Sequence, residues 1–323
     1  MTSVDKGHEG LGELQTTKYE VENSPLSLFT KPIHDEFITG GREVFLGNFN
    51  TLSNASNTIT ILVPPFSTEY LRLDSIRCFM KVRILEKDST VPSGLKNPTN
   101  TTDFSVCNYL SNAIWSKLSI KLNDLQIDSA CDYSYPYKSF IETLFSYNDE
   151  AKRSTLQTSF WYEDEPSTAD VNVKTANSGY NKRYNMVKGG KTLCLSFRLH
   201  HPLFFLKKHL IPQVSLKIEL QKADENFFII GKKDVQDKLK LVIDDIELRG
   251  HVVNVSKEVQ QSHIMNLMNK KAIYPFTHSV VNFNSIPSGL QQTTVQGVFQ
   301  GMLPTIVLCG LQDNSAISGT AIV

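Results

Sequence analysis

Residues 115–162 constrain the fold of this chain more than any other stretch. It opens with two short runs in which apolar and polar residues alternate, 115–122 and 125–128, and only Asn123 and Asp124 separate them. Alternation with a period of two is typical of a β-strand with one buried face. Asn and Asp both tolerate the left-handed backbone of a tight hairpin turn. The pattern therefore predicts a β-hairpin.

An aromatic cluster and a short helix follow this hairpin. Pro136 lies just ahead of residues 138–147, where a missing backbone N–H costs nothing, so we expect the helix to begin there. Its apolar stripe is expected to comprise Phe140, Ile141, Leu144 and Phe145. The aromatic cluster serves equally well as core that covers the open end of a sandwich or as a set of interface anchors, and the sequence leaves both readings open. Its members are Tyr133, Tyr135, Tyr137, Phe140, Phe145, Tyr147, Phe160, Trp161 and Tyr162.

Most of the remaining chain has the pattern of short strands joined by polar loops. A strand at 58–63 stops at two prolines, which cannot donate to a ladder. A long apolar run at 70–85 changes phase near Asp74 and Ser75, which indicates a bulge or two successive strands. Many short strands with almost no helix predict an all-β fold, a jelly-roll β-sandwich with short helices. Further strands are expected at 193–199, 214–220, 227–230 and 239–248, and loops at 88–103 and 163–191.

The pattern divides the chain into four parts. Residues 1–40 are expected to form a flexible N-terminal arm and residues 41–253 the first jelly-roll domain. Residues 254–273 are expected to form a linker helix, with Ser256 as its cap. Residues 274–323 are expected to begin a second jelly roll, with strands at 279–283, 293–299 and 305–308.

The second jelly roll is expected to be incomplete, because so few strands leave one sheet face uncovered and its edges unpaired. The sequence thus indicates a C-terminally truncated chain, or one whose missing segment is supplied from elsewhere. On this reading the isolated protein of 323 residues would be poorly soluble or would misassemble.

Charge and hydropathy exclude several classes of protein. The chain has 33 basic and 33 acidic residues, whereas a protein that grips nucleic acid through its body usually has a basic excess, so no specific nucleic-acid contact is expected. The polar N-terminus is not a secretory signal, and no apolar run approaches the roughly twenty residues of a membrane span. We therefore expect a protein that is kept in a reducing compartment and not secreted, with its sequons at Asn54, Asn100 and Asn254 unused.

The cysteines indicate neither a disulfide scaffold nor a zinc site, since both need clustered spacing. The five are scattered and never form a C-x-x-C pair. They are expected to be reduced and mostly buried. They are Cys78, Cys107, Cys131, Cys194 and Cys309.

One run looks like the end of a phosphate-binding loop, Gly189-Gly190-Lys191-Thr192. Asn185 stands where that motif needs glycine, and the following residues alternate as a strand, whereas a phosphate loop opens a helix. A nucleotide site is therefore not expected.

Two polar groups could suggest chemistry, and structural roles explain both better. His200 and His201, with His209 nearby, form the densest histidine group, but neighbours on a strand point to opposite faces and cannot easily share a metal. Asp245 and Glu247 share a strand face beside Asp244, as on the solvated face of a sheet. The sequence therefore predicts no enzyme, no cofactor, and no catalytic, cofactor-binding or metal-ligating residue.

Residues 40–323 resemble the major capsid proteins of Polinton/Maverick elements and adintoviruses. Three segments carry the resemblance in the same order as in that family: the hairpin–helix stretch, an "RLH" segment before "LFF", and a "G-LP…G…N…G" segment. The matching residues are Tyr135-Pro136-Tyr137, Ile141-Glu142-Thr143-Leu144, Tyr147, Ala151-Lys152, Leu156-Gln157 and Tyr162; Arg198-Leu199-His200 with Leu203-Phe204-Phe205; and Gly301, Leu303-Pro304, Gly310, Asn314 and Gly319.

The resemblance implies a major capsid protein, or a truncated copy of one from an endogenous Polinton-like element. The complete protein would be a double jelly roll whose trimers form pseudo-hexagonal capsomers of an icosahedral shell. The resemblance also implies that the partners are other copies of the chain, neighbouring capsomers and a penton protein. The implied location is the virion capsid, after synthesis in the host cytoplasm and with assembly there or in the nucleus. This chain departs from the family pattern because strands of the second jelly roll are missing.

Two other classes of function stay open at this stage. One is a β-sandwich module that binds a sugar or peptide through residues 41–253, and saturable ligand binding would favour it. The other is a hydrolase on a jelly-roll scaffold, which a metal bound near His200 or Asp245 would favour.

Overall fold

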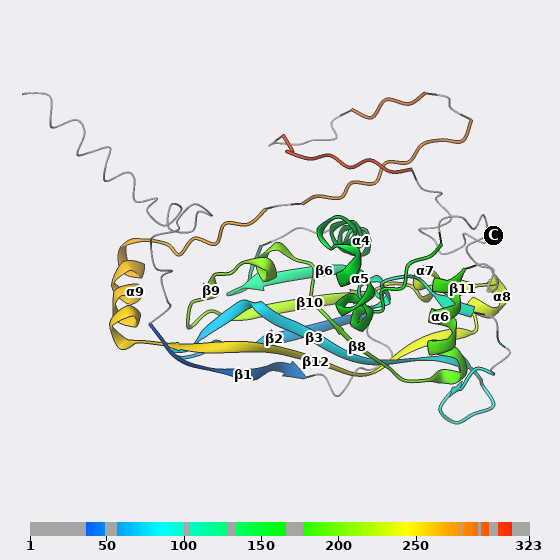
Figure 1. Cartoon of the computed structure of the whole chain (residues 1–323), viewed down its shortest axis with the longest axis horizontal. Helices are drawn as coiled ribbons and strands as arrows, with labels where there is room; N and C mark the ends of the chain where they lie inside the picture. The colour runs from blue at the N-terminus through cyan, green and yellow to red at the C-terminus, as the bar shows by residue number, and fades with distance from the viewer. Residues whose placement is uncertain are drawn as a thin grey trace, which may run out of the picture.

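The computed structural model describes two packed antiparallel sheets with short helices at their ends (Figure 1). One sheet has the order β1-β12-β3-β4, with β8 and β9 also paired to β3, and the other has the order β2-β10-β6-β7. A third, small sheet pairs β11 with β5. The structure describes residues 37–48, 57–99, 102, 104–127, 133–165, 177–277, 279–289, 292–296 and 303–311.

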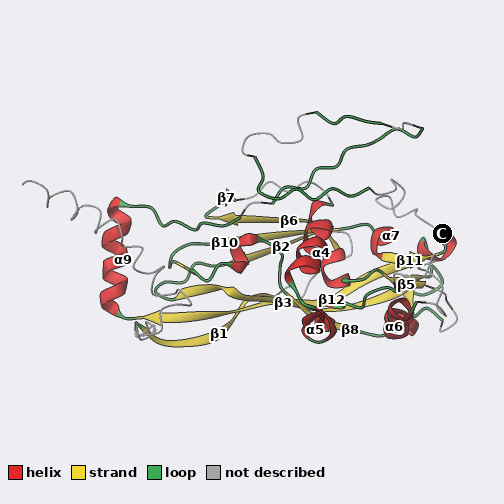
Figure 2. Ribbon diagram, turned by 45° about the horizontal axis from the view of Figure 1, so that its top comes forward, coloured by secondary structure: helices red, strands yellow, loops and turns green. Residues whose placement is uncertain are grey.

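Figure 2 shows the strands in yellow and the helices in red. The strands are β1 (Ile38–Asn48), β2 (Thr58–Val63), β3 (Tyr70–Lys87), β4 (Leu95–Lys96), β5 (Phe104–Val106), β6 (Trp115–Leu122), β7 (Leu125–Gln126), β8 (Leu193–Phe197), β9 (His209–Leu210), β10 (Leu216–Lys222), β11 (Ile229–Gly231) and β12 (Leu239–Val255). The helices are α3 (Leu110–Ala113), α4 (Ser134–Ser146), α5 (Asp149–Arg153), α6 (Ser178–Val187), α7 (Glu225–Phe228), α8 (Lys233–Gln236) and α9 (Lys257–Asn269), with short 3₁₀ turns η1 (Thr155–Ser159), η2 (Lys188–Gly190) and η3 (Pro202–Phe205).

The main strands pair in nested order, as in a jelly roll. Taken in chain order, β1, β2, β3, β6, β7, β8, β10 and β12 form four antiparallel pairs: first with last, second with seventh, third with sixth, and fourth with fifth. A long antiparallel hairpin that is folded over itself into two sheets has this pairing. The predicted all-β jelly-roll sandwich is confirmed.

Inward-facing side chains from the two sheets form one core. β2, β10 and β6 place Ile61, Ile218 and Ile120 side by side in register, and none of the three is exposed. Fully burying such a side chain contributes about 1.5–3 kcal/mol. β2 and β10 alternate buried and more exposed residues, so the period of two read from the sequence corresponds there to the two faces of the sheet. β6 is buried on both faces over most of its length.

The predicted hairpin is confirmed at β6 and β7. Asn123 and Asp124 both have positive φ, 46° and 64°, as a two-residue hairpin turn requires. The Asn123 side chain also accepts a hydrogen bond from the backbone N–H of Ser215, at 2.9 Å, which ties the turn to the start of β10.

The phase slip near Asp74 and Ser75 is a bulge within a single strand. β3 is continuous from Tyr70 to Lys87, and its register against β12 shifts between Arg77 and Arg72. The Ser75 hydroxyl accepts a hydrogen bond from the backbone N–H of His251 at 2.8 Å. This bond satisfies a donor that the bulge removes from the ladder.

Several predicted boundaries are wrong. β10 begins at Leu216 and not at residue 214, β12 continues beyond residue 248 to Val255, and the expected loop at 88–103 contains the short strand β4. α4 begins at Ser134 and not at residue 138, so Pro136 lies inside the first turn, where no intrahelical N–H is needed. Phe227 and Phe228 belong to α7 and not to a strand, which starts only at Ile229, because Asp224 and Glu225 favour a helical turn at that point.

The expected loop at 163–191 contains a helix, α6. Its buried face comprises Gly179, Tyr180, Arg183, Tyr184 and Val187, a helical spacing built from residues that do not look like a core. The Asn177 side chain caps the helix by accepting from the backbone N–H of Tyr180 at 3.1 Å.

Arg183 is the buried centre of this region. Its side chain is not exposed, and it donates to the carboxylate of Asp164 at 2.6 Å, to the carbonyl of Val106 at 2.8 Å and to the carbonyl of Tyr162. A buried guanidinium needs such a full set of acceptors. Arg183 therefore joins α6 to β5 and to the segment that follows Trp161.

The C-terminal part of the chain differs from its prediction. A helix is present within the predicted range 254–273, as α9 (Lys257–Asn269), but Ser256 makes no side-chain cap bond and none of the helix is buried. In the described residues between 274 and 311 there is no strand, so the strands expected at 279–283 and 305–308 are wrong for this structure. A strand requires a ladder partner, and none lies beside these residues in the part of the chain that is described. The third expected strand, 293–299, lies partly outside the described residues.

The N-terminal boundary also shifts. β1 starts at Ile38, within the segment assigned to the arm, and residues 1–36 lie outside the described residues. Cys131 and the sequons at Asn54 and Asn100 lie outside them as well.

Gly179→Ala is expected to destabilise the protein, although Ala normally stabilises a helix interior relative to Gly by about 0.5–1 kcal/mol. A Cβ at this position would overlap the backbone carbonyl oxygen of Glu163. We expect a loss of about 1–3 kcal/mol in the free energy of unfolding, measured by chemical denaturation. Gly40→Ala is the control, since no atom lies within 4 Å of its added Cβ. A Gly179→Ala protein at least as stable as the parent would contradict this packing.

Candidate interaction surface

The Gly-Gly-Lys-Thr run ends a helix and does not begin one. Gly189 and Gly190, with φ of 72° and 71°, follow α6, and Lys191 leads into β8. A phosphate loop places its amides at the start of a helix. The run therefore lacks the geometry that binds phosphate and serves as a turn between α6 and β8.

The three histidines have separate surroundings. His201 accepts from the backbone N–H of Leu203 at 3.1 Å and caps η3, whereas the ring of His200 faces α4 and His209 lies in β9. In the described ranges no three His, Cys, Asp or Glu side chains lie close enough together to hold a metal ion.

The carboxylates of β12 are all engaged by basic side chains. Arg83 donates two hydrogen bonds to Asp244, at 2.7 and 2.6 Å, Lys81 lies 3.4 Å from Asp245, and Arg249 lies 2.7 Å from Glu247. Each pair is partly exposed and contributes at most about 1 kcal/mol. These residues form the charged outer face of a sheet, as the strand pattern indicated.

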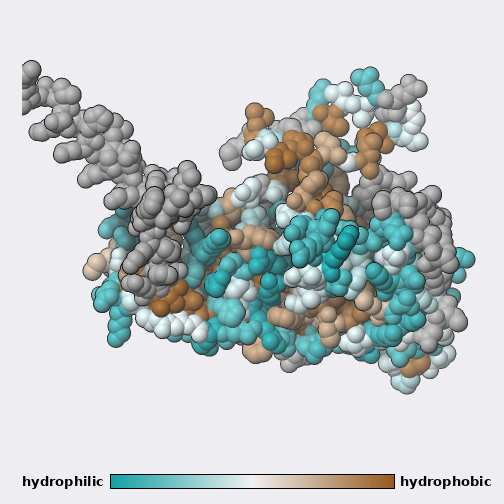
Figure 3. Space-filling model, viewed as in Figure 1, coloured by the Kyte–Doolittle hydropathy of each residue, from teal (hydrophilic) through white to brown (hydrophobic). Residues whose placement is uncertain are grey.

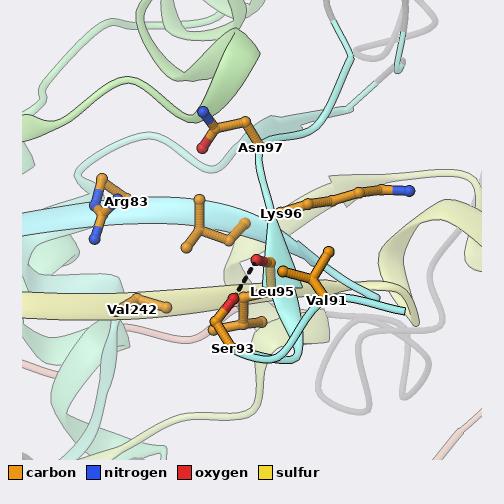
Figure 4. Close-up of a pocket in the computed structure, with 8 residues that line it drawn as sticks. Arg83, Val91, Ser93, Leu95, Lys96, Asn97 and Val242 are labelled. Carbon is orange, nitrogen blue, oxygen red and sulfur yellow. Dashed lines mark hydrogen bonds between the residues drawn. The ribbon is translucent and has the colours of Figure 1, made fainter. Parts of the chain in front are cut away.

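Figure 4 shows a shallow hollow bounded by β3, β4 and β12. Its lining mixes polar with apolar side chains, and its two cationic side chains, Arg83 and Lys96, are already paired with Asp244 and Asp88. A ligand pocket has polar groups that converge on the ligand. Here the Ser93 hydroxyl also donates within the chain, to the carbonyl of Leu95 at 2.9 Å, so the hollow gives no support to a ligand-binding module.

Asp88, the ion-pair partner of Lys96, gives a pH prediction. Hydrogen bonds from the Thr90 hydroxyl and amide, and then the Lys96 ammonium, lower the pKa of Asp88 to about 2, from 3.8. A depressed folded-state pKa adds stability above the unfolded pKa, and that stability is lost as pH falls through the folded value. Between about pH 4 and pH 2 the Tm of Asp88→Asn should therefore fall less steeply than that of the parent, and Thr90→Ala should lie between them. Parallel acid-side slopes in a thermal-shift series would rule this out.

A buried hydrogen-bond network holds α4 against the sandwich. Nε2 of His200 lies 2.8 Å from the Tyr109 hydroxyl and 3.2 Å from that of Thr143. Nδ1 of His200 lies 3.2 Å from Oε2 of Glu142, which is partly exposed. The network thus reaches from the buried start of α3 to the surface of α4.

Tyr135 completes the network on the inner face of α4. Its hydroxyl donates to Oδ1 of Asn112 at 2.6 Å and accepts from the backbone N–H of His200 at 3.2 Å. Burial raises the pKa of both Tyr135 and Tyr109 well above the ordinary value, so both hydroxyls keep their protons.

Tyr135→Phe is expected to cost about 1–3 kcal/mol of stability, because it leaves Asn112 and the His200 amide without their buried partner. Ser146→Ala, at an exposed position of the same helix, is the control and should stay within about 0.5 kcal/mol of the parent. Urea denaturation measures both. Equal stability of the two variants would show that the network adds nothing.

The apolar stripe predicted for α4 points away from the core. The buried side of the helix carries Ser134, Tyr135, Pro136, Ser139 and Thr143, since these pack against the polar network. Phe140 and Leu144 are 37% and 39% exposed, and Phe145 more so. We call Phe140, Leu144 and Phe145 the outer face of α4.

The aromatic cluster divides between the two readings that the sequence left open. Tyr135, Phe160 and Trp161 are core residues, each at most 3% exposed. Phe140 stacks on Trp161, with ring centroids 5.2 Å apart, and so links this core to the outer face of α4. Phe145 has the exposure expected of an interface residue.

The chain after α9 turns back along the sandwich on the side where α4 lies (Figures 1 and 2). The Tyr274 hydroxyl donates to the carbonyl of His209 and accepts from the amide of Ile211, both at 3.1 Å. The sequence pattern assigned this segment to a second jelly roll and did not identify it as an anchor on the sandwich. The signal that could have done so is the pair of aromatic residues, Tyr274 and Phe276, on either side of Pro275. Figure 3 shows apolar residues gathered along it.

The same segment makes further contacts, first beside η3 and then on α4. The Phe276 ring lies 5.9 Å from that of His201, and the Phe283 ring lies 5.5 Å from that of Tyr137. The Ser279 hydroxyl donates to Glu142 at 3.4 Å, so Glu142 contacts both the buried network and this segment. We call Tyr274, Phe276, Ser279 and Phe283 the clasp.

The cysteines agree only in part with their prediction. Cys78 is buried, Cys107 is half-buried, and burial raises the pKa of the Cys107 thiol to about 12. Cys194 and Cys309 are exposed and not buried, because the first faces outward on β8 and the second lies in the C-terminal segment. These four are free thiols.

Among the described residues, no helix combines the length and apolar character needed to cross a membrane.

Comparison with known proteins gives structural neighbours only. No protein-family model and no curated protein sequence matches the chain. A chain of the Sputnik virophage structure is similar, with a TM-score of 0.43 and 11% identity over 72% of this chain and 51% of that one. The mavirus major capsid protein gives 0.35 and 13% over 73% and 51%, and a chain of the PBCV-1 virus capsid gives 0.37 and 9% over 72% and 47%. This chain spans about half the length of the solved chains it matches. The fold assignment therefore rests on the strand pairing described above.

Proposed function

We propose that this protein is a structural component of a viral shell, a double jelly-roll major capsid protein whose described sandwich is the first jelly roll. The observation that carries the proposal is the nested pairing of β1 with β12, β2 with β10, β3 with β8 and β6 with β7. The resemblance of residues 40–323 to the Polinton/Maverick and adintovirus capsid proteins supports it. On this proposal the chain from Ser256, through α9, to residue 273 is the linker, and residues 274–323 begin the second jelly roll.

The proposed mechanism is geometric. Two similar sandwiches per chain, repeated three times, approximate sixfold packing around a threefold axis. Such a unit must be stiff, and the ladder between β3 and β12, strands of 18 and 17 residues, supplies a rigid spine about 60 Å long. The ion pairs of Arg83, Lys81 and Arg249 lie on the outer face of this ladder.

The proposed partners follow from this role. They are two further copies of the chain in a trimer, neighbouring capsomers and a penton protein, within a virion made in the host cell. No catalysis or cofactor is part of the proposal. His200, Asp244 and Asp245 are each engaged in a structural contact, so they support a scaffold better than a reactive site.

Self-association of the purified chain tests the proposal. For the fraction of the chain that stays in solution, we expect analytical ultracentrifugation to show a species of three chains that grows with concentration, and negative-stain images with threefold symmetry. Gly40→Ala, which leaves the packing unchanged, should associate as the parent does. A monodisperse, cooperatively melting monomer at every concentration would overturn the proposal. Saturable binding of a sugar or peptide by that monomer would establish the binding-module alternative in its place.

A further inference from the structure

Lysines gather at the end of the sandwich that lies opposite α9 (Figures 1 and 2). This end is formed by α6, η2 and α8, and by the region where β3 stops and β12 starts. Each of these lysines is at least partly exposed, and none forms an ion pair with any residue that the structure describes. We call this group the lysine end. Its members are Lys87, Lys182, Lys188, Lys191, Lys232, Lys233, Lys238 and Lys240.

The carboxylates in the same segments do not balance this charge. Glu86 and Asp88 lie 3.9 and 3.0 Å from the ammonium of Lys96, which is outside the group. Asp234 and Asp237 offset only part of the lysine charge. The chain as a whole has 33 basic and 33 acidic residues, so the excess at this end arises because the fold brings distant segments together.

Buried hydrogen bonds fix the helices of the lysine end to one another. Arg183 of α6 donates to the carbonyl of Val106 in β5 at 2.8 Å, and Val106 pairs with Ile229 of β11. Gln236 of α8 in turn donates to the carbonyl of Ile229 at 2.7 Å. The lysines therefore stand on a rigid base, and a partner that binds them does not have to order the backbone first.

Two of the lysines converge on one neutral residue. Nζ of Lys188 donates to Oδ1 of Asn185 at 2.7 Å, and Nζ of Lys191 donates to the backbone carbonyl of the same asparagine at 3.1 Å. These acceptors hold the ammonium groups but leave their charge uncompensated, and like charges held close together attract an anion. A lysine binds phosphate as a point charge, so the enclosing loop that the Gly-Gly-Lys-Thr run does not form is not needed.

The surroundings of the lysines favour the phosphate backbone of a nucleic-acid duplex as the partner. In the described residues of α6, η2, α8 and the adjoining strand ends, no large apolar side chain is exposed, whereas a membrane-bound surface needs apolar side chains that enter the headgroup region. Tyr184 of α6 is only 9% exposed, so no aromatic platform is available there for the bases of a single strand. Ammonium groups on a duplex contact phosphates whatever the base sequence.

We propose that the lysine end binds the phosphate backbone of double-stranded nucleic acid without sequence preference. The charge excess on a rigid base carries the proposal, together with the lack of exposed apolar and aromatic side chains around it. The proposal goes beyond the proposed shell function and stands on the charge distribution of a single chain.

Fluorescence anisotropy of a labelled duplex of about 20 base pairs tests this binding with the soluble fraction of the full chain. At about 50 mM salt we expect a Kd in the micromolar range that is equal for duplexes of different sequence. Each lysine that contacts a phosphate adds about −0.9 to the slope of log K against log salt concentration, so a steep salt dependence is expected.

Two variants with matched loss of charge locate the binding surface. The test variant removes charge at the lysine end, with Lys188→Gln, Lys191→Gln, Lys232→Gln and Lys233→Gln. The control removes the same charge at exposed positions near α9, with Lys207→Gln, Lys257→Gln, Lys270→Gln and Lys271→Gln. We expect the test variant to lose about tenfold or more in affinity for every sequence, and about one unit of salt slope for each lysine in contact, whereas the control should keep the slope of the parent.

The other outcomes each overturn the proposal. Equal losses in the two variants would show a diffuse effect of net charge, and a parent that does not bind, or binds without salt dependence, would exclude phosphate contacts. Tighter binding to vesicles that contain phosphatidylserine would make the partner a membrane, and tighter binding to polyglutamate would make it an acidic protein segment. The measurement does not require trimers, so the shell proposal can fail or succeed without affecting it.

Discussion

The antiparallel ladder between β3 and β12 is the interaction on which the rest of the structure depends. It runs from the pair Tyr70–Val253 to the pair Glu86–Leu239, and β1, β8, β9 and β4 all attach to one of its two strands. Its inward side chains, such as Val82 and Ile246, are fully buried against the second sheet. Because one face is buried, a slip of one residue would turn every apolar side chain outward, and the register is therefore strongly specified.

Polar side chains complete what the apolar core leaves open at the end of the sandwich. Arg183 with its acceptors fixes α6, and His200 with Tyr109, Thr143 and Glu142 fixes α4. These buried networks are fully hydrogen-bonded at the atoms named, which is the condition under which buried polar groups specify a unique arrangement. As a consequence, the inner face of α4 makes polar contacts, and the larger apolar residues of the helix lie on its outer face.

Much of the sandwich could be predicted because its signals are local. The turn at Asn123-Asp124, the bulge at Ser75 and the alternation in β2 and β10 each depend on a few neighbouring residues. The helix α6 could not be predicted this way, since its buried face uses Gly179 and Arg183, whose burial depends on Glu163, Asp164 and Val106 elsewhere in the chain. The same holds for the clasp, whose partners His209 and Glu142 are 65 and 137 residues away from Tyr274 and Ser279.

The sequence by itself determined the class of fold, because a period of two in apolar residues permits only strands with one buried face. It also determined where the chain must turn, through Asn-Asp, paired prolines and glycines. Only the tertiary structure decided which way α4 faces, which polar residues are buried and which side of the sandwich the C-terminal segment follows. The reason is physical: the orientation of an amphipathic helix depends on the free energy of all the contacts available to each face, and here the hydrogen bonds of Tyr135 and Thr143 outweigh the burial of Phe145.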